Sequence, residues 1–275
     1  MTTTSRPAVP AGTTEPGDAA DPSTAPPTVA ATGPDGTAPA IARRAAMAAD
    51  AVRTADGRPV RIAVVDYGMG NRRSVEKALE HAGASAVISA DPDEIRGADG
   101  IVLCGVGAFP AGATRLRESG LGDLVRDRVA DGVPLLGVCL GMQLLFDRSD
   151  ERGGAEGLGL IPGPVRVLAP GVGLKLPHIG WNLVRWTAPP AADAGAHDAV
   201  RAGLPDRAAF YHVHSHVAHP DDPTTVIAHG DYGGPFVTAV GRGRVHGVQF
   251  HPEKSSLDGL RLLRSFAATS ARCAT

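Results

Sequence analysis

Short apolar runs alternate with segments of helical periodicity through the first half of the chain. The run 62–66 ends in a glycine-rich turn, and similar runs follow at 86–88, 101–103 and 133–136. Apolar residues at helical spacing separate these runs. They are Val75, Ala78, Leu79 and Ala82, closed by Gly83, and then Leu116, Leu121, Leu124, Val125 and Val129, which we expect to form one helix. Continuous apolar runs of this length are typical of buried parallel strands, so the pattern predicts repeated strand–helix units.

The second half of the chain has a different pattern. Its apolar segments are short, rich in β-branched and aromatic residues, and separated by Gly and Pro, which predicts strands at 165–168, 181–186, 209–213 and 245–250. Apolar residues at 257, 260, 263 and 266 then predict a closing helix, capped by Ser255 or Ser256. We therefore expect an α/β fold: a mostly parallel sheet flanked by helices, with an added β-rich layer in the second half.

The first 58 residues do not show the pattern of a folded domain. They are dominated by Ala, Thr, Pro and Gly, contain no Phe, Tyr or Trp, and have no sustained apolar periodicity. Such a segment cannot bury enough surface to offset its ordering entropy, so we expect residues 1–58 to be a disordered tail. An alternative is that translation begins at Met47, close to the first strand. Residues 59–275 are expected to form one domain.

Composition narrows the class of protein. The formal net charge is −2, and no stretch approaches the ~20 apolar residues of a membrane span, so neither nucleic acid nor a membrane is an expected partner. The chain has three cysteines, Cys104, Cys139 and Cys273. An odd number in a chain of this length argues against a disulfide scaffold and favours a reducing cytoplasm.

The segment Gly137-Val138-Cys139-Leu140-Gly141 carries the strongest chemical signal. A cysteine framed by glycines directly after an apolar strand is typical of a nucleophile elbow, in which the sharp turn leaves no room for side chains beside it. The helix that follows favours the thiolate through its dipole. His251 can act as the base and Glu253 can orient it, because side chains two apart in an extended segment point the same way. These residues predict a Cys-His-Glu triad for acyl transfer.

Acyl transfer also needs donors for the oxyanion that develops on the substrate carbonyl. The backbone amide of Leu140, at the start of the helix, is one candidate. The second candidate is Val106, in the turn Gly105-Val106-Gly107 directly after the strand 101–103, because glycines let the backbone approach a substrate closely.

Several motifs together resemble a known family. The elbow and the segment 247–253 look like a class I, or triad, glutamine amidotransferase. Within that class the chain resembles the glutaminase subunit of imidazole glycerol phosphate synthase, from about residue 61 to residue 266. The motifs that carry this closer resemblance are Asp66-Tyr67-Gly68-Met69-Gly70-Asn71, Gly105-Val106-Gly107-Ala108-Phe109, Pro177-His178-Ile179-Gly180-Trp181-Asn182 and Lys254-Ser255-Ser256.

The resemblance implies a role for each matching residue. The catalytic residues would be Cys139 as nucleophile, His251 as base and then acid, and Glu253 as the orienting carboxylate, with Val106 and Leu140 as the oxyanion amides. Glutamine would be held by Gly107, Gln143, Glu151, Ser215 and His216. Asn71, Trp181 and Lys254 would face a (β/α)₈-barrel synthase subunit in a heterodimer. No cofactor or metal is implied.

The implied reaction is hydrolysis of L-glutamine to glutamate and ammonia. The ammonia would pass to the barrel, which forms imidazole glycerol phosphate and AICAR in histidine biosynthesis. We also expect latency without the partner, if the Val106 amide has to turn toward the site. Other readings remain open: a glutaminase subunit of another synthase, a stand-alone cysteine hydrolase, or a non-catalytic scaffold.

The sequence departs from the family pattern at two places. Cys104 stands where the family usually has Pro. A second thiol near Cys139 suggests redox control through a Cys104–Cys139 disulfide as an alternative. His212-Val213-His214-Ser215-His216 replaces the usual Phe-Val-His-Ser-Tyr, which weakens the aromatic contact expected at 216. Three histidines at alternate positions also suggest a zinc site, although without a positioned carboxylate or thiol the ligand set is incomplete. Gly68-Met69-Gly70 is a weak match to a dinucleotide-binding loop.

Overall fold

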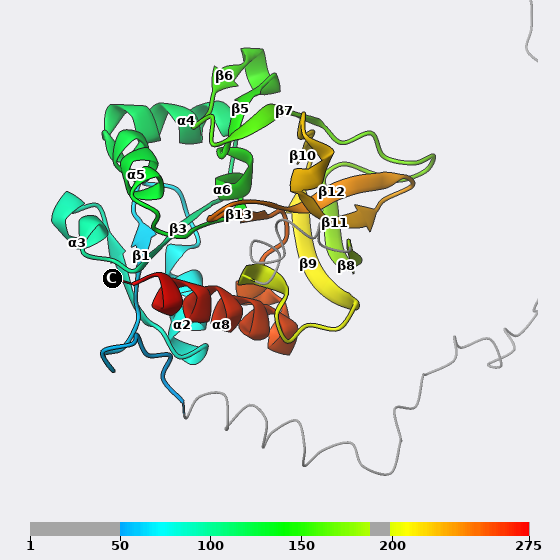
Figure 1. The fold of residues 1–275 in the computed structure, drawn as a ribbon. Helices are drawn as coiled ribbons and strands as arrows, with labels where there is room; N and C mark the ends of the chain where they lie inside the picture. The colour runs from blue at the N-terminus through cyan, green and yellow to red at the C-terminus, as the bar shows by residue number, and fades with distance from the viewer. Residues whose placement is uncertain (1–49, 188–198, 275) are drawn as a thin grey trace, which may run out of the picture.

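The computed structural model describes residues 50–187 and 199–274, and Figure 1 shows how their strands and helices are arranged. A central sheet runs through this part of the chain, with most helices packed on its two faces. The sheet has the strand order β2 (Ser85–Ser89), β1 (Arg61–Val65), β3 (Gly100–Gly105), β4 (Leu135–Cys139), β13 (Val245–Val248), β12 (Pro235–Arg242), β11 (Val226–Asp231), β8 (His178–Trp186) and β9 (Arg207–His214).

The half of the sheet from β2 to β13 is parallel, as the apolar runs predict. Alternate residues of each strand point to opposite faces, so each face carries its own apolar core. Ile62 and Val64 pack on the side covered by α2 (Arg72–His81) and α8 (Ser256–Cys273). Ala63 and Val65 pack on the side covered by α3 (Pro92–Arg96), α4 (Phe109–Glu118) and α5 (Leu121–Ala130). These two layers confirm the predicted α/β class.

The prediction of one continuous helix from Leu116 to Val129 is wrong. The structure has two helices, α4 and α5, which meet at Ser119 and Gly120. Gly120 has φ 71°, a conformation that breaks the helix and that glycine adopts without steric cost. The apolar spacing was compatible with one helix because both helices bury the same side against the sheet.

The strands of the second half mostly extend the main sheet. From β13 onward the pairing is antiparallel through β12, β11, β8 and β9. A smaller sheet has the order β10 (His216–Ala218), β7 (Ile161–Val167), β5 (Phe146–Ser149) and β6 (Ala155–Glu156). The added β-rich part of the prediction is therefore present as an extension of the main sheet together with this separate sheet.

The start of the described chain packs against the domain. The Val52 amide donates to the Gly83 carbonyl at 2.8 Å, and the Val60 amide donates to the Val52 carbonyl at 2.9 Å. Residues 50–58, which we assigned to the tail, therefore form part of the described fold. The remainder of the expected tail, including Met47, lies outside the described residues. Within the ranges that the structure describes, no helix is long and apolar enough to cross a membrane.

Three buried imidazoles lie where β8 and β9 pair. His178 and His212 stack with ring centroids 5.2 Å apart, and His178 meets His214 edge-on at 5.1 Å. Burial, and then the neighbouring imidazole of His214, lowers the pKa of His212 to about 3. Burial, and then His178, lowers the pKa of His214 to about 3 as well. Both side chains are therefore neutral at ordinary pH.

This burial makes stability depend on pH. The folded-state pKa of His212 lies below the ordinary value of 6.5, so the unfolded chain binds a proton that the folded chain does not. The free energy of unfolding should then fall as pH decreases from about 6.5 toward about 3, by roughly 1.4 kcal/mol per pH unit for each such residue. We expect His212→Phe to make this dependence less steep in chemical denaturation. His81→Gln, on the exposed surface of α2, should leave it unchanged, and an equal slope in wild type and His212→Phe would contradict the assignment.

Candidate active site

Cys139 occupies a strained turn between β4 and α6 (Leu140–Gln143). Its φ of 55° and ψ of −113° are unfavourable for a residue with a side chain, so the surrounding packing must hold it. A Cβ on Gly137 would lie 2.7 Å from the Gly141 carbonyl oxygen, and a Cβ on Gly141 would overlap the Leu103 carbonyl. The two glycines are thus required for the close approach of β3, β4 and α6, as expected for a nucleophile elbow.

His251 and Glu253 form a buried pair beside this turn. His251 follows β13, the strand next to β4, and its Nδ1 lies 2.7 Å from Glu253 Oε1. Glu253 belongs to the short 3₁₀ helix η3 (Pro252–Lys254), and its side chain is fully buried. Asn71 Nδ2 donates a hydrogen bond to the same carboxylate oxygen. Asn71, which the resemblance assigned to a docking face, therefore also contacts the carboxylate that pairs with His251.

The electrostatics of His251 suit a proton carrier. Burial by itself disfavours the charged imidazole, but the interactions with Cys139 and with Glu253 outweigh burial and raise the pKa of His251 to about 10. Its Nδ1 is occupied by Glu253, whereas Nε2 makes no standard hydrogen bond among the described residues. Nε2 is therefore the atom available to exchange a proton with Cys139, since a base and nucleophile must meet through the nitrogen that the orienting group leaves free.

A pocket of about 390 Å³ opens above Cys139. Its lining includes all the residues predicted for the oxyanion and for glutamine. These are Val106, Leu140, Gly107, Gln143, Glu151, Ser215 and His216. Pro177, Val213 and His214 also line the pocket, although the sequence predicts no role for them there. Pro177 is the first residue of the motif 177–182, so the sequence marks it as a functional residue. Its position near Cys139 depends on the pairing of β8 with β9, which the sequence pattern does not predict.

Hydrogen bonds hold the polar wall of this pocket in place. Gln143 Nε2 donates to the His216 carbonyl at 3.1 Å and to Gln249 Oε1 at 3.0 Å. On the other side, Glu151 Oε2 accepts from the Phe109 amide at 2.7 Å, which satisfies a free backbone donor at the start of α4. Glu151 is therefore fixed to a helix N-terminus, with its side chain 14% exposed.

Cys104 lies near the triad but is not suited to redox chemistry. It is buried on β3, directly opposite Val138 in the neighbouring strand. Burial, and then the negative charge of Glu253, raises the pKa of Cys104 to about 12. Because the thiolate is the reactive form, this environment disfavours a disulfide with Cys139.

The three residues assigned to a docking face lie on connected elements. Trp181 is 56% exposed on β8, and its ring meets Tyr211 of β9 edge-on at 6.4 Å. The Lys254 ammonium lies 5.7 Å from the centroid of the same Tyr211 ring. Trp181 and Lys254 thus flank one tyrosine, while Lys254 directly follows Glu253.

The structure gives no support to the zinc alternative. His212 Nδ1 lies 3.0 Å from the Phe210 carbonyl and Nε2 lies 2.8 Å from Thr238 Oγ1, so both ring nitrogens are occupied. His216 lies on a different strand, β10, after the chain turns at Ser215. Among residues 50–187 and 199–274, no group of three or more His, Cys, Asp or Glu side chains is arranged to hold a metal ion.

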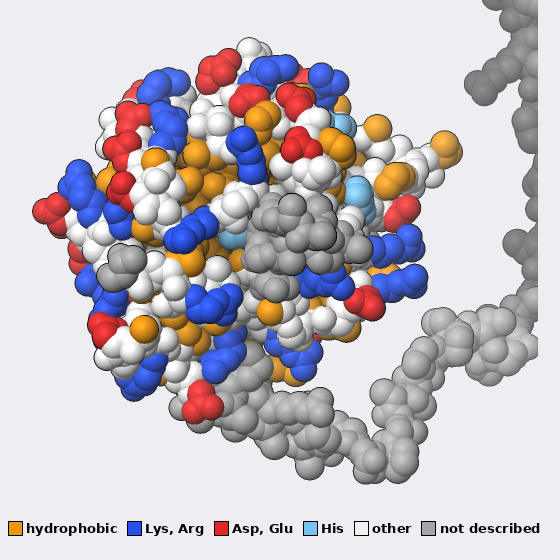
Figure 2. Space-filling view, viewed as in Figure 1, with side chains coloured by type: hydrophobic (Ala, Val, Ile, Leu, Met, Phe, Trp, Pro, Cys, Tyr) orange, Lys and Arg blue, Asp and Glu red, His pale blue; other side chains and the backbone are white. Residues whose placement is uncertain are grey.

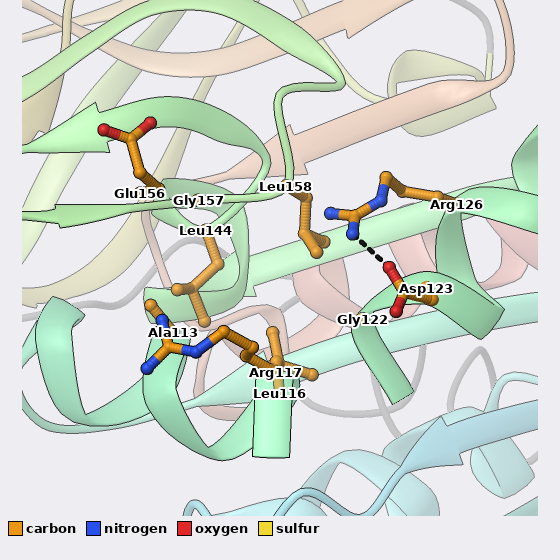
Figure 3. Close-up of a pocket in the computed structure, with 10 residues that line it drawn as sticks. All are labelled: Ala113, Leu116, Arg117, Gly122, Asp123, Arg126, Leu144, Glu156, Gly157 and Leu158. Atoms are coloured by element: carbon orange, nitrogen blue, oxygen red, sulfur yellow. Dashed lines mark hydrogen bonds and ion pairs between the residues drawn. The ribbon is translucent and has the colours of Figure 1, made fainter. Parts of the chain in front are cut away.

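A second pocket lies away from the predicted residues. Figure 3 shows Arg117 of α4 and Asp123 and Arg126 of α5 around it, with Leu144 and Leu158 forming its apolar wall. Arg126 is paired with Asp123. None of the predicted catalytic, oxyanion or glutamine-binding residues lines this pocket.

Sequence comparison relates this chain to known proteins. The family model of class I glutamine amidotransferases matches residues 63–269. The imidazole glycerol phosphate synthase subunit HisH of Moorella thermoacetica is 45% identical over 205 residues, which cover 74% of this chain and 93% of that protein. The HisH subunit of Methylococcus capsulatus is 48% identical over 215 residues, covering 74% and 94%.

Solved structures agree on the fold. A crystal structure described as a glutamine amidotransferase superposes with a TM-score of 0.59 at 19% identity, covering 76% of this chain and 98% of that one. PurLQS from Thermotoga maritima gives 0.58 at 19% identity, covering 75% and 97%. The family model and the curated relatives each span most of the folded chain. This chain belongs to the class I glutamine amidotransferase family.

Proposed function

We propose that this chain hydrolyses L-glutamine to glutamate and ammonia as the glutaminase subunit of imidazole glycerol phosphate synthase, in histidine biosynthesis. The observation that carries the proposal is the strained Cys139, which lines a pocket of about 390 Å³ beside the buried His251–Glu253 pair. Relatives named as HisH subunits of that synthase, with 45% and 48% identity, support the choice of pathway.

The residues divide the reaction into two acyl transfers. Cys139 loses its proton to His251 Nε2, and the thiolate attacks the side-chain carbonyl of glutamine. The amides of Val106 and Leu140 stabilise the oxyanion, and His251 then protonates the departing ammonia. Water, deprotonated by the same imidazole, attacks the thioester and releases glutamate. Glu253 keeps Nδ1 of His251 protonated, so that Nε2 is the nitrogen that exchanges protons throughout.

The pocket wall indicates how the amino-acid end of glutamine is held. Both amide hydrogens of Gln143 are used, one by the His216 carbonyl and one by Gln249. We infer that Gln143 binds substrate through its oxygen, which suits the α-ammonium group. Glu151 has the charge to do the same, while backbone groups of Gly107 and of Ser215–His216 suit the carboxylate.

The outer face of β8 suits a protein partner. Ile179, Trp181 and Leu183 alternate along the strand and are 60%, 56% and 41% exposed. Further exposed apolar residues lie in the connection between β7 and β8, at the right of the view in Figure 2. An uncovered strand face with a large aromatic residue is typical of an interface, and ammonia needs a dry path to remain an unprotonated nucleophile. We propose that a (β/α)₈-barrel synthase subunit binds here, in the cytoplasm, to form a heterodimer.

Activity with the partner is the first test. We expect glutamine-dependent glutamate release to be low in the isolated chain and to increase with a recombinant imidazole glycerol phosphate synthase barrel and its ribulosyl ligand. Cys139→Ala should lower it at least about a thousandfold, because the nucleophile is lost. Activity that ignores the barrel would instead indicate another synthase or a stand-alone hydrolase. Absence of activity in both conditions would favour a scaffold.

The role of Glu253 can be tested by titration of His251. Glu253→Gln keeps a hydrogen-bond acceptor but removes the charge that helps to raise the pKa of His251. We expect the pKa of His251 to fall in this variant, measured by NMR of labelled histidine, and kcat to fall roughly 10²- to 10⁴-fold. Asp258→Asn removes a carboxylate from α8 that pairs with Arg261, so it should leave the titration of His251 unchanged. An unchanged pKa in Glu253→Gln would argue against the pair.

The partner surface can be tested by affinity. Trp181→Ala removes the exposed ring and should weaken binding of the barrel by roughly 10- to 100-fold, as expected for an aromatic anchor. Isothermal titration calorimetry would measure the dissociation constant. Arg126→Ala, in the second pocket, is the matched surface control and should bind normally. Wild-type affinity in Trp181→Ala would place the interface elsewhere.

A further inference from the structure

Gln249 lies next to the nucleophile, and the triad mechanism gives it no role. It directly follows β13 and is fully buried, and its side-chain Nε2 lies 3.8 Å from Cys139 Sγ. Its backbone amide donates to the Thr238 carbonyl of β12 at 2.8 Å. The residue is therefore held in the centre of the sheet, between the strand that carries Cys139 and the antiparallel extension.

Neighbouring hydrogen bonds allow only one orientation of the Gln249 amide. The His216 carbonyl can only accept, so the atom of Gln143 that lies 3.1 Å from it must be the nitrogen. The same nitrogen lies 3.0 Å from Gln249, which must therefore present its oxygen. The NH₂ group of Gln249 is then left to face Cys139. The orientation follows from donor and acceptor chemistry, which decides how an amide is assigned.

A chain of imidazoles fixes the carbonyl on which this orientation depends. His214 Nδ1 lies 3.1 Å from the His216 carbonyl oxygen and must carry a proton. His214 Nε2 then accepts from His178 Nδ1 at 3.2 Å, and His178 Nε2 accepts from Asn182 Nδ2 at 3.3 Å. Every donor in this chain points from β8 toward the pocket. The His216 carbonyl thus accepts from His214 on one side and from Gln143 on the other, and this pair of donors fixes its position beside Gln143 and Gln249.

The network matters most when Cys139 is deprotonated. The sulfur also lies 3.9 Å from the Val213 carbonyl, which can accept from the neutral thiol but cannot stabilise a thiolate. The Gln249 NH₂ group can stabilise the thiolate, because a hydrogen bond to an ionised acceptor is stronger than one to a neutral acceptor. When the proton moves from Sγ to His251 Nε2, the charge left on sulfur faces this donor.

We propose that Gln249 is a further catalytic residue, whose side-chain N–H stabilises the Cys139 thiolate, and that Gln143 and His214 orient it. This inference rests on the proposed function only in taking Cys139 as the nucleophile. Glutamine binding to Gln143 would then act on the same network that contacts the sulfur.

Alkylation of Cys139 by iodoacetamide tests the proposal without glutamine or the partner subunit. Rates would be measured by intact mass spectrometry at pH 7 on the full chain carrying Cys273→Ser, since Cys104 is buried and present in every variant. Gln249→Glu puts a negative charge beside the sulfur, and Gln249→Met removes the donor with little change in size. We expect alkylation to slow roughly ten- to a hundredfold in Gln249→Glu and less in Gln249→Met.

The two variants separate electrostatic stabilisation from a change in access. Because Glu and Met are similar in size, a purely steric effect would slow alkylation equally in both variants, and equal slowing would overturn the proposal. A wild-type alkylation rate in either folded variant would overturn it as well. Circular dichroism and thermal unfolding would confirm that each variant folds. If Gln249→Glu does not fold, the alkylation rate of Gln249→Met alone tests the proposal. His214→Asn keeps a donor near Nδ1 and should react faster than His214→Leu, which has none; equal rates would remove His214 from the proposal. Retained glutaminase activity in Cys139→Ala would refute the proposed function separately.

Discussion

The backbone of Cys139 is held at φ 55° by packing that only glycine permits on either side. Gly137 lets β4 approach α6, and Gly141 lets α6 lie against the Leu103 carbonyl of β3. The turn ends β4 at Cys139, next to His251, which follows the adjacent strand β13. The reactive geometry thus depends on the close spacing of three parallel strands, and the two cores on their faces supply the burial that maintains this spacing.

The antiparallel extension of the sheet supplies what the parallel half lacks. Cys139, His251 and the proposed oxyanion amides of Val106 and Leu140 all lie at the carboxyl ends of parallel strands. One side of the pocket comes from the end of β9 and the turn at Ser215, and the hydrogen bonds behind it run through buried imidazoles, of which His214 has a lowered pKa. A neutral imidazole can donate and accept at once, which allows a directed chain that a charged side chain could not form in so buried a place.

The site and the proposed partner surface share elements. Lys254 directly follows Glu253, and it faces Tyr211, which also meets the exposed ring of Trp181. Asn71 hydrogen-bonds the buried Glu253 carboxylate, although its motif resembles a docking segment. A partner that rests on β8 and η3 would therefore contact residues one step from the triad. Such proximity is consistent with a subunit whose ammonia must be delivered to another active site.

Local sequence patterns determined the parts of this protein that depend on chain neighbours. The apolar runs determined the parallel strands, and the glycine frame determined the elbow at Cys139. The two-residue spacing predicted Glu253 beside His251, although the segment 252–254 is a 3₁₀ helix and not the expected extended segment. The helix break at Gly120 was missed because the apolar period continues across it. Only the tertiary structure decided which distant residues meet: that Asn71 reaches Glu253, that His178 pairs with His214, and that Gln249 turns its amide to the sulfur. These contacts join residues far apart in the chain, and their geometry depends on strand order and register, which periodicity does not encode.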